Sequence, residues 1–93
     1  MNLYLVSQCE NTGYDTYDSF VVAVETEKEA RETSPNNSYK WHDDKWFFQY
    51  ADGTETDEIY NHSWCDPKYV KAELIGIAKE GVEGIVCTSF NAG

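Results

Sequence analysis

Only one short stretch of this chain carries the signals of a helix, and that limits how its strands can be connected. Thr26 and Glu29 have the spacing of a capping box, in which a hydroxyl and a carboxylate each satisfy a backbone N–H at a helix start. A Ser-Pro pair follows within about two turns, so the helix is expected over residues 27–33, with Ala30 facing inward. Since parallel strands need long crossover connections, usually helical, the strands are expected to pair antiparallel.

Alternating apolar patterns indicate the first strands. Residues 2–9 have apolar side chains on both faces, which is typical of a central strand. Residues 20–24 are rich in β-branched side chains and are expected to pair with residues 2–9 in a hairpin with a long connection. Aromatic and polar side chains alternate over residues 39–50 around a turn at residues 42–44, which predicts a second hairpin with an aromatic face.

The C-terminal half is expected to complete the sheet. Residues 70–78 and 84–90 predict a closing hairpin, with a turn between them. Residues 55–60 are a weaker candidate, because three acids in six residues suit an exposed edge. The expected fold is α+β: one mostly antiparallel sheet of about 4–6 strands with a single short helix on one face, in one domain over residues 1–93.

Net charge restricts the classes of partner. The chain has 17 acidic and 7 basic residues, which give a formal net charge of −10. A field of that sign repels nucleic acid and anionic membranes and attracts basic proteins, with a strength that falls as salt rises. Residues 1–27 and 46–67 contain no Lys or Arg, so these two acidic stretches are the candidate contact surfaces. The structural alternative is that the acids are solvated faces that keep the protein dissolved.

No motif for catalysis stands out in the sequence. It contains no Gly-rich phosphate loop and no serine nucleophile motif, so we expect no enzyme and no cofactor. A metal site at His62 and Cys65 is the sharpest chemical alternative. Cys9 and Cys87 fall in expected strands and are interpreted as small buried hydrophobes. The odd number of cysteines, three, and the lack of an apolar leader favour a cytoplasmic location.

Tyrosines beside carboxylates indicate a protein-binding surface. Tyrosine offers a large, rigid contact area, and carboxylates pair with Arg or Lys across an interface. Residues 14–19 supply both types on an expected connection between strands, and further carboxylates follow in later turns. The alternative is that the tyrosines fold back onto the sheet and the aspartates cap turns. The candidate partner-binding residues are Tyr14, Asp15, Tyr17, Asp18, Asp43, Asp44, Asp57 and Glu58.

The same segment carries a resemblance to a known group of proteins. Residues 14–19 (YDTYDS), the capped Glu29-Ala30-Arg31 and the C-terminal SFNAG resemble a family of small acidic proteins encoded by tailed bacteriophages. The resemblance spans both ends of the chain and covers the middle loosely. It implies expression in the cytoplasm of a host bacterium. By analogy with anti-CRISPR-like inhibitors, some of which mimic nucleic acid, it also implies action against a host defence system.

These observations lead to one functional hypothesis and two alternatives. The hypothesis is a protein that binds a basic host protein, possibly one that holds nucleic acid, by presenting carboxylates in place of phosphates. It binds neither nucleic acid nor membrane itself. The first alternative is a structural or regulatory phage protein that forms a homodimer through an exposed strand edge. The second alternative is a small metal-binding domain.

Overall fold

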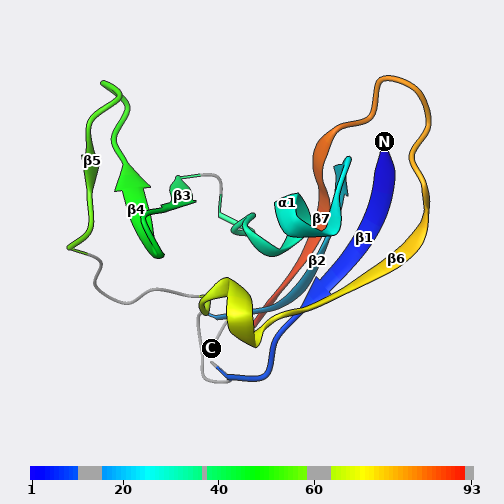
Figure 1. Cartoon of the computed structure of the whole chain (residues 1–93), viewed down its shortest axis with the longest axis horizontal. Coiled ribbons are helices and arrows are strands. Elements are labelled where there is room, and N and C mark those ends of the chain that lie inside the picture. Colours follow the sequence, from blue (N-terminus) through cyan, green and yellow to red (C-terminus); the bar gives the residue numbers. More distant parts are fainter. Residues whose placement is uncertain (11–15, 37, 59–63, 92–93) are drawn as a thin grey trace.

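The computed structural model describes residues 1–10, 16–36, 38–58 and 64–91, which form two antiparallel sheets and two short helices. The larger sheet has the strand order β6-β1-β2-β7, and the smaller has the order β3-β4-β5. Figure 1 shows the smaller sheet to one side of the larger, with α1 on the face that turns toward it. The elements are β1 (Asn2–Ser7), β2 (Thr16–Val24), α1 (Glu27–Arg31), β3 (Tyr39–His42), β4 (Lys45–Gln49), β5 (Glu55–Thr56), η1 (a 3₁₀-helix, Pro67–Tyr69), β6 (Lys71–Ile77) and β7 (Gly84–Asn91).

The mostly antiparallel α+β architecture is confirmed, but the expected single sheet is wrong. The seven strands of the described residues divide into two sheets, and η1 is a helical turn beyond the single helix expected. The division follows from the hairpin of β3 and β4, which pairs with β5 and with no strand of the larger sheet. Instead it is attached by side chains, because its aromatic face packs into the common core.

Strand β1 is central, as its apolar pattern predicts. It pairs with β2 on one side, from Asn2↔Val24 to Ser7↔Ser19, and with β6 on the other. Tyr4 and Val6 are buried on the face that carries the core. On the opposite face, Leu3 and Leu5 are partly buried, so β1 has a pairing strand at each edge and its core on one face.

The expected closing hairpin of residues 70–78 and 84–90 is wrong, although both strands exist. β6 pairs with β1 and β7 pairs with β2, so the two strands lie at opposite edges of the larger sheet. The connection crosses the end of the sheet, where the Ala78 N–H donates to the Met1 carbonyl at 2.8 Å. Turn residues identify where a strand ends but not which edge the next strand joins. The β1–β2 hairpin has two free edges; β6 pairs at the edge of β1, and β7 pairs at the edge of β2.

Strand β2 begins earlier than expected. Tyr17 and Asp18 belong to the strand and not to a connection, because residues 16–19 pair with the C-terminal end of β7. Tyr17 lies opposite Phe90, with ring centroids 4.7 Å apart. Cross-strand aromatic pairs of this kind stabilise a ladder, and the partner strand was too distant in sequence to be anticipated.

Helix α1 begins where the sequence predicts and ends two residues earlier than predicted. The Thr26 side chain accepts from the Glu29 N–H at 3.2 Å, which confirms the N-cap. Ala30 is fully buried, as expected. The helix stops at Arg31 because Thr33 leaves the helical path: its hydroxyl donates back to the Glu29 carbonyl and its backbone bridges to Lys40 of β3.

The core lies between the larger sheet, α1 and the aromatic face of the smaller sheet. Phe20 of β2 and Trp64 meet edge to face at 5.3 Å, and each is 1% exposed. Trp46 of β4 joins the same cluster, and its indole N–H donates to the Cys65 carbonyl at 3.0 Å. This buried bond ties the smaller sheet to the segment that covers the larger one. Neither helix of the described residues is long and apolar enough to cross a membrane.

Candidate acidic binding surface

The β3–β4 hairpin turns through two aspartates. Asp43 and Asp44 have positive φ values of 52° and 60° and link His42 to Lys45. Two-residue hairpin turns with positive φ at both positions match the natural twist of the strands, and aspartate tolerates this conformation better than most residues. Both carboxylates are therefore exposed at the tip of the smaller sheet.

His42 joins the turn to β5. Its Nδ1 lies 3.2 Å from a carboxylate oxygen of Asp43, and its Nε2 lies 2.6 Å from a carboxylate oxygen of Glu55. The ring stacks on Phe47 with centroids 3.9 Å apart and planes 4° from parallel. The hydrogen bond to Glu55 raises the pKa of His42 above its ordinary value, and the hydrogen bond to Asp43 is the second-largest cause. One carboxylate from the β3–β4 turn and one from β5 are thus held against one imidazole.

A second cross-strand pair lies on the same sheet. Lys45 Nζ is 2.8 Å from a carboxylate oxygen of Asp57. The hydrogen bond and charge attraction between them lower the pKa of Asp57 and raise the pKa of Lys45. Asp57, a predicted partner-binding residue, is therefore partly neutralised. Glu58, the next one, is exposed, and no ion pair of the described residues includes it.

The other four predicted residues belong to the N-terminal half. Tyr14 and Asp15 lie outside the described residues. Tyr17 packs against the core beside Phe90, which agrees with the alternative interpretation that the tyrosines fold back onto the sheet. Asp18 is exposed at a point where the β2–β7 register shifts. The structure thus places Asp43, Asp44, Asp57 and Glu58 on the smaller sheet and its turns, and Tyr17 and Asp18 on the larger sheet.

Two further carboxylates, not singled out from the sequence, lie on the smaller sheet. Asp52 caps the β4–β5 turn by accepting from the backbone and hydroxyl of Thr54, and these bonds lower its pKa. Glu55 is held by His42. Both fall in the acidic stretch of residues 46–67, and their closeness in sequence to Asp57 was the signal that could have identified them as members of the same surface. We call the six together the acidic sheet surface: Asp43, Asp44, Asp52, Glu55, Asp57 and Glu58.

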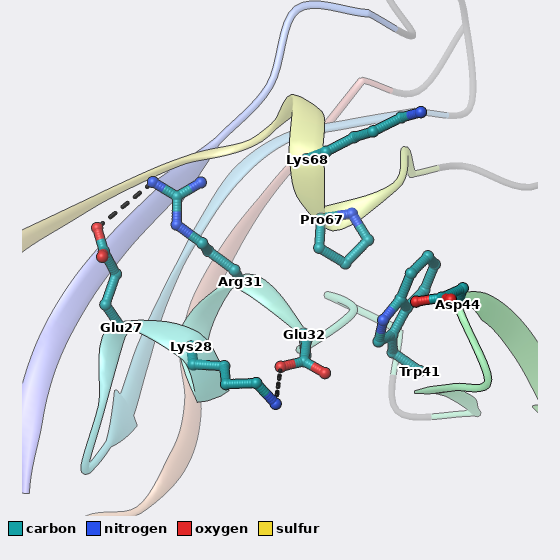
Figure 2. A pocket seen from close by; sticks show the side chains of 8 residues that line it. All are labelled: Glu27, Lys28, Arg31, Glu32, Trp41, Asp44, Pro67 and Lys68. Carbon is teal, nitrogen blue, oxygen red and sulfur yellow. Dashed lines mark hydrogen bonds and ion pairs between the residues drawn. The ribbon is translucent and has the colours of Figure 1, made fainter.

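A cleft of about 490 Å³ opens between α1, η1 and the β3–β4 hairpin. Figure 2 shows Pro67 and Trp41 at this opening, with Asp44 beside the Trp41 ring. Along α1, Lys28 pairs with Glu32 at 2.9 Å and Arg31 pairs with Glu27 at 3.4 Å. Three acids and three bases line the cleft, so its charge is balanced, unlike that of the adjacent sheet. Only Asp44 belongs to both the cleft and the acidic sheet surface.

The cysteines do not lie as expected. Cys9 and Cys87 are exposed, which overturns their interpretation as buried hydrophobes: Cys9 follows the end of β1, and Cys87 lies on an edge strand. Cys65 is buried, and burial, followed by the Asp66 charge, raises the pKa of its thiol to about 11. The other half of the proposed metal pair, His62, lies outside the described residues.

Comparisons with known proteins add no relative to this description. No protein-family model, no curated protein and no solved structure matches the chain. The acidic sheet surface is therefore the feature from which a function can be inferred.

Proposed function

We propose that this protein acts by binding a basic surface of another protein through the acidic sheet surface. One observation carries the proposal: residues 39–58 place six carboxylates and two lysines on one small sheet and its turns, a net charge of −4 with His42 neutral. All six residues are exposed; Glu55 begins β5, and the other five lie outside the strands. Carboxylates in such a group attract a cationic surface together.

The internal ion pairs favour this role over a purely structural one. Asp44, Asp52 and Glu58 make no ion pair with any described residue, so their charges are available to a partner. Lys45 offsets Asp57, and His42, when protonated, shares its charge between Asp43 and Glu55. Exposed surface pairs of this kind contribute little to stability, so a partner's arginine can replace them at low cost.

The charge sign indicates the class of partner. A basic surface that accepts six carboxylates is one that also accepts phosphates, so a protein that handles nucleic acid fits best. Binding there would act by competition with nucleic acid. The resemblance to small acidic phage proteins supports a host defence protein as the target, and it is the reason to use bacterial proteins in the test.

The experiment separates the acidic sheet surface from net charge. A partner captured from bacterial lysate and identified by mass spectrometry is purified, and its affinity is measured by calorimetry at low and high salt. The test variant is Asp44→Lys with Glu58→Lys. The matched control is Glu73→Lys with Glu83→Lys, which reverses two exposed acids outside the smaller sheet with the same change in net charge.

We expect the test variant to weaken binding at low salt by about tenfold or more, and the control to weaken it much less. Duplex DNA should displace the protein from its partner. Equal losses in the two variants, or a partner that holds DNA and this protein at the same time, would contradict the proposal.

A further inference from the structure

The outer edge of β7 differs from the other sheet edges of the described residues. The β5 edge is two residues long, and β3 is partly covered by the bridge between Thr33 and Lys40. The β6 edge carries the charged residues Lys71 and Glu73. Short length, cover and charge are ways in which proteins protect an edge from pairing with another chain. Strand β7 is eight residues long and carries no charged residue and no proline.

The free edge of β7 is also exposed. Val86 is 50% exposed and Phe90 is 47% exposed, and Cys87, Thr88 and Ser89 between them are exposed as well. Strand β7 pairs on its inner side with β2 only, so its outer row of backbone N–H and C=O groups faces no strand among the described residues. A row of this kind is a template for one more strand.

We propose that β7 pairs antiparallel with β7 of a second copy of this chain, which extends the larger sheet across a two-fold axis. An antiparallel pair of identical strands is self-complementary, because each donor of one copy meets an acceptor of the other under the same rotation. A second copy is favoured over a basic partner by charge. The strand offers a cationic partner no carboxylate, and it is the edge where two chains of net charge −10 can meet without placing like charges opposite each other.

The pairing is confined to the C-terminal part of the strand. The register with β2 shifts between Val21 and Val22, where Val86 is the extra residue of β7. A bulge twists the strand and interrupts its hydrogen-bond row. At the second register shift the extra residue, Asp18, belongs to β2, so residues 87–91 are the stretch of β7 without an inserted residue. In an antiparallel pair, directly opposed residues point to the same face of the sheet, and neighbouring residues of one strand point to opposite faces. One residue must therefore lie directly opposite its own copy, and the two-fold axis runs between these two copies.

Charge and area together set the strength of this contact. A few paired residues bury less than the roughly 800 Å² per partner of a standard interface, so the dimer is weak. Its affinity should rise with salt, because the two −10 chains repel each other over about 10 Å at 0.1 M salt and about 3 Å at 1 M. Binding of a basic partner to the acidic sheet surface weakens with salt. The two proposals therefore respond to salt in opposite directions and can fail independently.

The first test is sedimentation equilibrium of the purified full chain at low and high salt. The variant Thr88→Lys places two lysines close together across the axis, and the matched control Ile77→Lys adds the same charge at an 80% exposed position on β6. Each changes the net charge of the chain from −10 to −9, so the weaker overall repulsion would by itself strengthen the dimer in both variants. We expect Thr88→Lys to raise the dissociation constant by about tenfold or more, and Ile77→Lys to leave it unchanged or lower it. A monomer at all salt concentrations, or equal effects of the two variants, overturns the proposal.

The second test does not depend on the fold tolerating a new charge. Single exposed cysteines are placed in turn at residues 87–91: Cys9 and, where needed, Cys87 are changed to serine, the buried Cys65 is kept, and a copper oxidant is added. The residue on the axis lies about 4.5–5.5 Å from its own copy between Cα atoms, within the range of a disulfide. We expect one position to cross-link into dimers far faster than the others. Uniformly slow cross-linking at all five positions overturns the proposal.

Discussion

Replacing Trp46 with phenylalanine tests whether one buried hydrogen bond holds the two sheets together. Trp46 is 4% exposed, and its indole N–H donates to the Cys65 carbonyl at 3.0 Å in the core. Phenylalanine keeps an aromatic ring there but has no donor, so the buried Cys65 carbonyl loses this partner. The two strands of the hairpin offer a control, because Trp41 lies opposite Trp46 and is only half-buried.

The expected loss follows from two contributions. A buried carbonyl left without its donor costs about 1–3 kcal/mol. The smaller ring removes apolar area worth about 1 kcal/mol. The Trp46→Phe variant should therefore lose about 2–4 kcal/mol in the free energy of unfolding, whereas Trp41→Phe should lose less than about 1 kcal/mol.

The assay is urea denaturation followed by far-ultraviolet circular dichroism, with thermal melting as a second measure. A loss of 2 kcal/mol lowers the melting temperature of a domain of this size by about 8–16 °C. If the sheets form one cooperative unit, a single transition shifts as a whole. Losses for Trp46→Phe and Trp41→Phe that agree within error would refute the reasoning. A second transition in Trp46→Phe alone would show that the bond couples two units that can unfold separately.

Two further predictions concern titratable groups. The pKa of His42 lies above 6.5 in the folded state because of Glu55 and Asp43, so its protonated form stabilises the fold below about pH 6.5, and this contribution is lost as the pH rises through the folded-state pKa. Glu55→Gln should thus destabilise more at pH 5.5 than at pH 8.5, and NMR titration should show a lower His42 pKa in the variant; an unchanged pKa would contradict the contact. Since burial raises the pKa of the Cys65 thiol to about 11, a variant that retains only Cys65 should react with a thiol reagent at pH 8 at least about tenfold more slowly than one that retains only Cys87. Comparable rates would show that Cys65 is accessible.

Local interactions account for the parts of the fold that were predicted. The N-cap depends on Thr26 and Glu29, three residues apart, and the β3–β4 turn depends on two adjacent aspartates. The apolar side chains on both faces of β1 indicate a central strand, whichever strands lie beside it. Signals of this kind are complete within a few residues, so the sequence displays them directly.

The candidate site was only partly accessible from the sequence. The acidic stretch at residues 46–67 pointed to the right region, since four of the six members of the acidic sheet surface lie in it, within β5 or within three residues of it. This stretch contains no Lys or Arg, but the fold places a lysine from outside it against one of its carboxylates. Lys45 comes just before the stretch, and the antiparallel pairing of β4 with β5 brings it to 2.8 Å from Asp57. Cross-strand contacts of this kind depend on register, which a one-dimensional charge pattern does not contain.

The amino acids alone determine the sign of the surface, the start of helix α1, the antiparallel pairing and the central place of β1, because charge, capping and apolar patterning are properties of neighbouring residues. The tertiary structure decided which strands are partners, that the hairpin of β3 and β4 stands in a sheet of its own, and that the uncharged strand β7 lies at an edge. Strand pairing is a competition among distant segments for the same backbone hydrogen bonds, and its outcome depends on which side chains pack together in the core.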